Sequence, residues 1–178
     1  MSVESIVIAT DLNKTFKAEQ KGLDDVQALQ GINMQIKTGQ LTALVGPDGA
    51  GKTTFLRLIA GLYKPTAGSL EVLGMDVAKE TQSVQDRISY MPQKFGLYED
   101  LSIQENLDLY ADLHGVPMDV RKERFARLLK ITDLARFTER PAGKLSGGMK
   151  QKLGLACTLV RSPELLLLDE PSVGVDPL

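Results

Sequence analysis

Cysteine, long apolar runs and an excess of either charge are what this sequence has least of. The single cysteine, Cys157, excludes an intramolecular disulfide and is compatible with a reducing compartment. The longest apolar candidate, residues 153–160, is far shorter than the roughly 20 residues that cross a membrane. Residues 1–11 lack the basic start of a secretory signal, so we expect any membrane role to act through a partner chain. The net charge of −2 gives no electrostatic reason to expect a nucleic-acid partner.

A glycine-rich segment, residues 46–53, reads Gly-Pro-Asp-Gly-Ala-Gly-Lys-Thr and matches the phosphate-loop pattern G-x-x-x-x-G-K-[ST]. The apolar run at 41–45 predicts a buried strand before it, and apolar residues at helical spacing predict a helix after it. Glycines let successive backbone N–H groups surround an anion at the start of that helix. Lys52 is then expected to reach the β- and γ-phosphates and Thr53 to bind Mg²⁺. The alternative is a plain glycine-rich turn before an ordinary helix.

Other segments of the chain predict an antiparallel layer beside the phosphate-loop strand. Residues 6–10 and 32–37 have the composition of strands, and a polar connection, residues 17–25, separates them. Residues 68–73 predict another strand of this layer, and residues 88–91 predict a further core strand. At 178 residues, with 43% hydrophobic side chains, the chain is long enough for one sizeable core with a subdomain attached.

The composition then becomes helical. Residues 102–130 show apolar positions at helical spacing, interrupted by Gly-Val-Pro at 115–117. We interpret residues 93–144 as an inserted helical subdomain. The chain returns to core elements with a helix opened by Ser-Gly-Gly at 146–148 and a four-leucine strand at 165–168, expected to be buried on both faces.

Two carboxylates, Asp169 and Glu170, follow that leucine strand directly. Ligands of open α/β sheets bind at the carboxyl ends of the strands, and neighbouring residues on a strand point opposite ways, so the two acids are suited to different tasks. Asp169 is expected to help hold Mg²⁺, and Glu170 to polarise an attacking water. Without the phosphate loop, a solvated acidic turn would be the better interpretation.

Four motifs in order carry a family resemblance. Residues 145–149, Leu-Ser-Gly-Gly-Met, resemble the signature motif of ATP-binding cassette (ABC) transporters; Gln93 resembles the Q-loop glutamine, and residues 173–176 resemble the D-loop. Together with the phosphate loop and the leucine strand ending in two acids, they make the sequence similar to the nucleotide-binding subunit of drug- and lipid-exporter members. Phe16 occupies the place of the aromatic residue that stacks on adenine, although it could equally belong to the core.

The resemblance implies an α/β fold: a P-loop NTPase (RecA-like) core with a flanking antiparallel β layer and an inserted helical subdomain. It implies one nucleotide-binding domain over residues 1–178, with 1–92 and 145–178 forming the β layer and core and 93–144 the helical subdomain. The family has a further strand after the D-loop, bearing a switch histidine, whereas the only histidine here is His114. We therefore expect the C-terminal core strands to be missing from this segment, and turnover to require the complete cassette.

The site residues that the resemblance implies fall into three groups. Glu170, Gln93 and Lys52 are the expected catalytic residues, and Thr53, Gln93 and Asp169 the expected Mg²⁺ ligands. The expected ATP contacts are Phe16, Gly46, Pro47, Asp48, Gly49, Ala50, Gly51, Lys52, Thr53, Thr54, Ser146, Gly147 and Gly148. Two positions depart from the family's commoner residues, Asp48 in the phosphate loop and Met149 in the signature.

The partners follow from the signature. Ser146 is a good N-cap, and the two glycines leave the first helical N–H groups uncovered for an anion. In the family this helix end meets the γ-phosphate held by a second nucleotide-binding domain, and a transmembrane permease holds the pair at the cytoplasmic face of the cell membrane. Phe95, Leu97 and Tyr98 are expected either to dock a permease helix or to pack within the subdomain.

Two alternatives to an exporter ATPase stay open at this stage. One is a non-transport ATPase of the same family, acting in translation or DNA repair. The long coiled-coil insertions of DNA-repair relatives do not fit residues 94–144, the only residues between the Q-loop and the signature. The other alternative is a nucleotide-binding fragment without activity.

Overall fold

A computed structural model describes residues 5–18, 22 and 24–171. The chain divides into two compact units, residues 1–88 and 89–178, and each is described by itself. The predicted D-loop at 173–176 lies outside the described residues. In the part of the chain that the structure describes, no helix is both long and apolar enough to cross a lipid bilayer.

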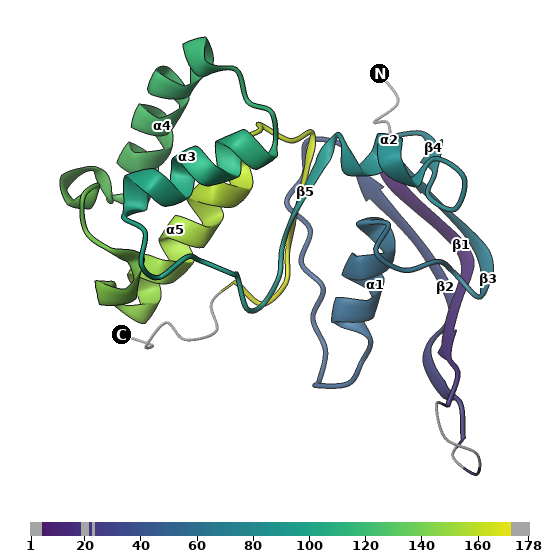
Figure 1. Cartoon of the computed structure of the whole chain (residues 1–178). Helices are drawn as coiled ribbons and strands as arrows, with labels where there is room; N and C mark the ends of the chain where they lie inside the picture. Colours follow the sequence, from purple (N-terminus) through teal and green to yellow (C-terminus); the bar gives the residue numbers. More distant parts are fainter. Residues whose placement is uncertain (1–4, 19–21, 23, 172–178) are drawn as a thin grey trace. The chain divides into compact units, whose positions relative to one another are not determined.

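The first unit is built on a four-stranded sheet in the order β2-β1-β3-β4 (Figure 1). β1 (Ser5–Phe16) pairs antiparallel with β2 (Val26–Lys37) and β3 (Ala67–Val72), and β3 pairs antiparallel with β4 (Met75–Asp76). Helix α1 (Lys52–Ile59) contacts β2 and β3, and the short α2 (Thr81–Gln85) follows β4. The predicted antiparallel layer is confirmed.

β1 is longer than the sequence predicts because it continues through a bulge at Asp11. Asp11 has a φ of 44°, and a Cβ on Gly68 would lie only 2.1 Å from the Asp11 carbonyl oxygen. Side chains complete the interrupted ladder: Asn33 Oδ1 accepts from the Asp11 N–H, and Asn13 Oδ1 accepts from the Gly31 N–H. The strand therefore runs on to Phe16, where the apolar alternation alone ends at Thr10.

The expected strand at 41–45 is wrong for this structure. These residues adopt no regular secondary structure, Leu41 is fully exposed and Val45 is 93% exposed. A strand exists only where neighbours accept and donate its backbone hydrogen bonds. Among the described residues no strand pairs with 41–45, so the apolar run lacks the partners that would make it a strand.

The second unit combines a two-stranded sheet with three helices. β5 (Ile88–Met91) pairs with β6 (Leu165–Leu168), and α5 (Gly147–Leu159) packs against α3 (Ile103–Leu113) and α4 (Met118–Thr132). Short 3₁₀ turns cover 135–137 and 142–144. In β6 only Leu167 is buried and its neighbours are half-buried, so this strand is less enclosed than expected.

A single apolar cluster holds the helices together, and it extends past the predicted limit at Lys144. Its buried members are Ile103, Leu107, Ala111, Val116, Phe125, Leu128, Leu129, Leu134, Ala142, Leu145, Leu153, Ala156, Cys157 and Val160. The face of α5 that begins at the signature therefore packs within the helical layer. Burial also raises the pKa of the Cys157 thiol, which fits an inert packed cysteine.

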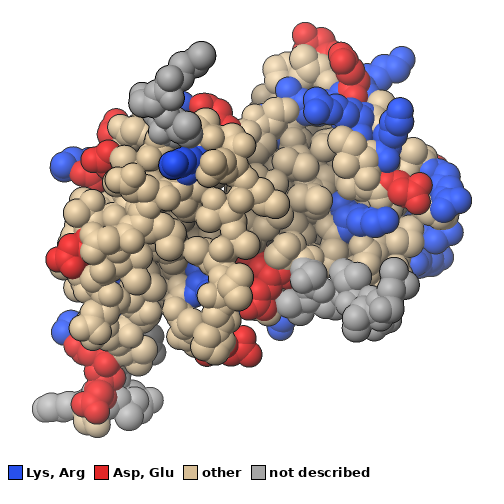
Figure 2. All heavy atoms as spheres, turned by 180° about the vertical axis from the view of Figure 1, so that it is seen from behind, with Lys and Arg blue, Asp and Glu red and all other residues tan. Residues whose placement is uncertain are grey.

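Charges of both signs are spread over the surface. In Figure 2 lysine and arginine side chains gather over the helical unit, and acidic side chains lie among them. Helix α4 alone carries Arg121, Lys122, Arg124, Arg127 and Lys130. The mixture of signs in this view agrees with the formal net charge of −2.

Asn106 fixes the turn that leads into α3. Its side chain is fully buried; Oδ1 accepts from the Tyr98 N–H at 3.0 Å, and Nδ2 donates to the carbonyls of Tyr98, Leu101 and Ser102 at 2.9–3.1 Å. The preceding residue, Glu105, completes a capping box with Ser102, and the bond from the Ser102 N–H lowers the Glu105 pKa. The Asn106 amide thus accepts from the Tyr98 N–H and adds a second donor to three carbonyls that backbone N–H groups also contact.

We expect Asn106→Ala to lower the free energy of unfolding by about 2–4 kcal/mol, because it removes the acceptor of the Tyr98 N–H and three carbonyl contacts and opens a small cavity. Urea denaturation monitored by circular dichroism measures the change. Gln104→Ala, on the same helix, removes only a bond to Asp108 and is expected to cost less than about 1 kcal/mol. Equal losses in the two variants would contradict the role given to Asn106.

Candidate nucleotide-binding and catalytic site

The phosphate loop closes around the Lys52 ammonium. Nζ donates to the carbonyl oxygens of Gly46 and Pro47, each at 2.8 Å, and the Ala50 N–H donates to the Pro47 carbonyl at 3.2 Å. Lys52 is also the first residue of α1, so its charge lies at the positive end of the helix. The loop residues 46–50 are exposed, Asp48 included. This arrangement holds a cation at an exposed loop before a helix start, where an anion is stabilised.

Two glycines of the loop have conformations that other residues avoid. Gly49 has a φ of 80° and Gly51 a φ of 85°, in the left-handed region. At Gly51 space is also limiting, because a Cβ would lie 2.6 Å from the Ala28 carbonyl oxygen and 2.7 Å from Leu29 Cδ2 on β2. The loop therefore reaches the sheet through a contact that only glycine permits.

Gly51→Ala is expected to lower ATP affinity at least about tenfold and to destabilise the fold by more than about 2 kcal/mol, the left-handed penalty plus a backbone clash. Calorimetric titration and thermal unfolding measure the two effects. Gly74→Ala is the matched control, because Gly74 has a φ of 75° but a methyl group added there would meet no atom within 4 Å. Gly74→Ala is expected to lower the free energy of unfolding by about 1 kcal/mol and to leave ATP affinity unchanged. Similar losses in both variants would show that the close contact of Gly51 with β2 is unimportant.

The two acids after β6 each have a partner in the second unit. Asp169 is only 2% exposed, and its Oδ2 accepts from the Tyr90 hydroxyl at 2.8 Å; its N–H donates to the Met91 carbonyl at 2.9 Å. Glu170 is half-buried, and its Oε2 accepts from Gln93 Nε2 at 2.7 Å. The structure thus brings three predicted residues, Gln93, Asp169 and Glu170, to one end of the β5–β6 pair.

Glu170 has a φ of 49°, which is unusual for a residue with a side chain. The left-handed conformation ends the strand abruptly and turns the Glu170 carboxylate toward Gln93, while Asp169 stays buried against Tyr90. Backbone strain of this kind, about 1–2 kcal/mol, persists where surrounding structure enforces it and is common at active sites.

The signature helix begins as the sequence predicts. Ser146 is the N-cap of α5, and its side chain accepts from the Met149 N–H at 3.3 Å. Ser146 and Gly147 are exposed, and a Cβ on Gly148 would meet no atom within 4 Å. The start of this helix is therefore exposed, and an anion there is stabilised by the helix dipole.

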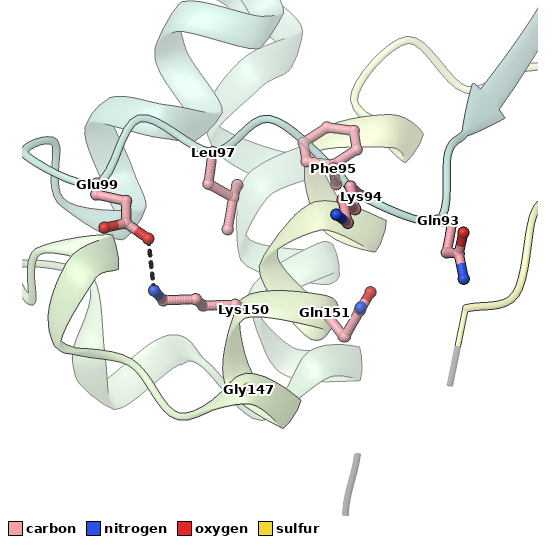
Figure 3. A pocket seen from close by; sticks show the side chains of 8 residues that line it. All are labelled: Gln93, Lys94, Phe95, Leu97, Glu99, Gly147, Lys150 and Gln151. Atoms are coloured by element: carbon pink, nitrogen blue, oxygen red, sulfur yellow. Dashed lines mark hydrogen bonds and ion pairs between the residues drawn. The ribbon is translucent and has the colours of Figure 1, made fainter. Parts of the chain in front are cut away.

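A cavity of about 350 Å³ lies in the second unit between the segment after β5 and the start of α5 (Figure 3). Its lining residues are Gln93, Lys94, Phe95, Leu97, Glu99, Gly147, Lys150 and Gln151. Lys150 Nζ and Glu99 Oε1 form an ion pair at 2.6 Å on its rim. The cavity thus joins the predicted Q-loop glutamine to the signature helix.

The segment after β5 packs largely within the helical unit. The Phe95 and Tyr110 ring centroids are 5.1 Å apart, and a Cβ on Gly154 of α5 would lie 3.1 Å from the Phe95 ring. Phe95 and Leu97 are partly buried against the helical cluster, while Tyr98 is 52% exposed. Of the two expectations for these residues, internal packing describes Phe95 and Leu97.

The oxygen donors fit magnesium with a phosphate-bearing ligand better than a protein-only metal cage. In the second unit Asp169 offers a buried carboxylate and Gln93 an amide, and in the first unit Thr53 offers a hydroxyl. No group of three or more His, Cys, Asp or Glu side chains suited to a metal exists among the described residues. Mg²⁺ typically uses one or two protein carboxylates and completes its shell with waters and phosphate oxygens.

Some contacts at the site have no counterpart in the sequence predictions. The Tyr90 hydroxyl donates to Asp169. The only sequence feature that points to Tyr90 is its position on a predicted strand, three residues before Gln93. Tyr63, which contacts Phe16, lies in a turn with no motif. Lys52, Thr53 and Phe16 belong to the first unit, and the Gln93–Glu170 group and Ser146 to the second.

The fold and the site together define a P-loop ATPase domain. The structure of the ATP-binding cassette MJ0796, solved as a dimer in a post-hydrolysis state bound to ADP and Pi, is similar with a TM-score of 0.81 and 28% identity. The alignment covers 96% of this chain and 76% of that one. The structure of cbiO1 from Clostridium perfringens, part of the transporter complex cbiONQ, gives a TM-score of 0.82 at 29% identity over 97% of this chain and 68% of the other.

A family model described as ABC transporter matches residues 29–173, and the chain therefore belongs to the ABC transporter family. It is 54% identical, over 98% of its length, to the probable multidrug ABC transporter ATP-binding protein YbhF of Escherichia coli, of which it spans 29%. It is 37% identical, over 99% of its length, to the bacitracin transport ATP-binding protein BcrA of Bacillus licheniformis, of which it spans 54%. The chain thus covers about a third to a half of these relatives.

Proposed function

We propose that this chain forms the MgATP-binding and hydrolysing part of an ABC exporter subunit. The observation that carries the proposal is the Gln93–Glu170 pair beside the buried Asp169, found in a chain whose phosphate loop holds its lysine ammonium in place. The names of the relatives support transport over translation or DNA repair, because they describe multidrug and bacitracin transporters.

The first unit would bind the triphosphate. ATP would displace the loop carbonyls from Lys52, whose ammonium then pairs with the β- and γ-phosphates while the loop N–H groups donate to their oxygens. Phe16, half-buried at the end of β1, would stack on the adenine. ATP would gain affinity from the charge of Lys52 at its phosphates and from the contact with Phe16 at its adenine.

The second unit would supply the groups that act on water. Glu170 accepts the proton of the attacking water, and the Gln93 amide, 2.7 Å from the Glu170 carboxylate, orients that water. Asp169, Thr53 and Gln93 would hold Mg²⁺, which neutralises charge on the phosphates when bound. The hydrogen bond from Tyr90 keeps the Asp169 carboxylate in one orientation.

The exposed start of α5 would complete the site across a dimer. Ser146, Gly147 and Gly148 would contact the γ-phosphate held by a second nucleotide-binding domain, so that ATP joins two cassettes. A permease subunit in the membrane would be moved by this closure, with the cassette at the cytoplasmic face. The cavity between the segment after β5 and α5 is a suitable place for a permease helix to dock.

Two measurements on the full-length protein test this function. Phosphate release that requires both ATP and Mg²⁺ is expected, together with copurification of a membrane permease. Copurification with ribosomes and no permease would contradict transport, and absence of ATP-dependent phosphate release would contradict the enzyme assignment.

A further inference from the structure

We infer that Tyr63 is a positioning residue for nucleotide binding, which holds the Phe16 ring ready for the base and ties it to the helix of the phosphate loop. The inference rests on the proposed function, since it takes Phe16 as the residue that stacks on adenine. Tyr63 lies in the turn between α1 and β3, outside every motif in the sequence.

The direct contact is between the two rings. The Phe16 and Tyr63 centroids are 5.3 Å apart, with an interplanar angle of 78°, an edge-to-face arrangement that aromatic pairs prefer. Both residues are half-buried, so Phe16 keeps part of its surface open to a ligand. The edge-to-face contact restrains the plane of the Phe16 ring before any base arrives.

Lys14 contacts both rings of the Phe16–Tyr63 pair. Lys14 Nζ lies 4.9 Å from the Phe16 centroid and 5.5 Å from the Tyr63 centroid, within cation–π range of both. The same ammonium donates to the Lys64 carbonyl at 2.9 Å, which anchors it to the turn that carries Tyr63. The cation therefore links the strand of Phe16 to the turn of Tyr63.

Hydrogen bonds of Thr66 hold that turn against the end of β1. The Thr66 N–H donates to the Asn13 carbonyl at 2.8 Å, and Thr66 Oγ1 accepts from the Thr15 N–H at 3.0 Å. The position of Tyr63 relative to Phe16 thus depends on several independent contacts, and the ring pair does not rest on side-chain packing alone.

On its other side Tyr63 contacts the helix that starts at the phosphate loop. Its hydroxyl accepts from Arg57 Nη1 at 3.1 Å, and its N–H donates to the Arg57 carbonyl at 3.3 Å. Arg57 lies in the last turn of α1, whose first residue is Lys52. One short element therefore carries the phosphate cation at its start and the support of the base-binding ring at its end.

Ordering of the Phe16 ring by Tyr63 should affect only the part of the binding free energy that comes from stacking of the base. A ring that is ordered in advance loses less side-chain freedom when the ligand binds, so more of the stacking contact appears as affinity. Removing Tyr63 should therefore weaken ligands that have a base and leave ligands without one unchanged. A residue with a merely structural role in the loop would affect both kinds of ligand equally.

Calorimetric titration of the full-length protein with ATP and with inorganic tripolyphosphate, which has no base, makes that distinction. Tyr63→Leu is expected to weaken ATP about three- to tenfold, a fraction of a base-stacking contact, with tripolyphosphate affinity changed less than about twofold. Tyr63→Phe keeps the ring and loses only the Arg57 bond, so its loss should be smaller. Tyr98→Leu, a half-exposed tyrosine of the other unit, is the matched control and should change neither affinity.

Phe16→Ala is expected to repeat the pattern of Tyr63→Leu, and the double variant to bind ATP no worse than Phe16→Ala alone, because Tyr63 acts through Phe16. Equal losses for ATP and tripolyphosphate, additive losses in the double variant, or no loss in Tyr63→Leu would overturn the inference. If instead Lys52→Ala binds both ligands as well as the unaltered protein does, the proposed function itself fails.

Discussion

Lys52→Ala is expected to weaken ATP binding to the full-length protein by at least about a hundredfold, because charge-assisted hydrogen bonds to two phosphates are each worth roughly 1.5–3 kcal/mol. The Lys52 ammonium already sits in the loop, 2.8 Å from the carbonyls of Gly46 and Pro47. No other residue that the structure describes in the loop carries a positive charge, so nothing there replaces it.

Calorimetric titration measures the affinity, and thermal unfolding shows whether the fold survives. The unfolding temperature without nucleotide should change little, since the bonds lost are to exposed loop carbonyls. Lys37→Ala, an exposed lysine at the end of β2, is the control and should bind ATP normally. ATP affinity within about threefold of the unaltered protein would contradict the role of Lys52.

Glu170→Gln is expected to keep ATP binding and lower kcat by about 10²–10⁴, the range typical for loss of a general base. The substitution changes charge and basicity with little change of shape. Gln93 Nε2 still finds an oxygen acceptor at that position, so the local geometry at the end of β6 should survive. The loss should therefore fall on kcat and leave the dissociation constant for ATP near its original value.

Steady-state phosphate release separates the two quantities when it is combined with ATP titration. Glu139→Gln, an exposed glutamate of the helical unit, is the control and should leave both unchanged. A Glu170→Gln protein with near-normal turnover would show that another group accepts the proton of water.

The sequence predicts local structure best where chemistry and pattern coincide. Ser146 followed by two glycines predicts the start of α5, and the structure confirms both the N-cap and its bond to the Met149 N–H. The same holds for β5 and for the two helices on either side of Gly-Val-Pro at 115–117. In these cases short-range contacts decide the conformation, and the residues concerned are neighbours in the chain.

Predictions that depend on distant residues are less complete. The run at 41–45 has the composition of a strand, but a strand also needs neighbouring backbone, and the described residues supply none. β1 passes through Asp11 because Gly68, Asn33 and Gly31 accommodate a bulge, which no local pattern announces. Contacts between residues far apart in the sequence cannot be predicted from the spacing of apolar residues.

At the candidate site, too, the residues that belong to motifs are predicted from the sequence, and the residues that support them are not. The phosphate loop and the acids Asp169 and Glu170 are evident from motif and position, and the structure adds the pairing of Glu170 with Gln93, 77 residues away in the chain. Tyr90 and Tyr63 are found only from the structure, since each acts through a contact with one partner and belongs to no motif. Supporting residues of this kind become visible only when the chain is folded.

Calorimetric titration of ATP into the full-length Glu170→Gln protein, with and without Mg²⁺, measures nucleotide binding without turnover. We predict saturable binding that is clearly tighter with Mg²⁺, together with a shift of the protein from monomer to dimer in the presence of MgATP. Absence of magnesium-dependent ATP binding would contradict the proposal that this chain is the MgATP-binding part of its subunit.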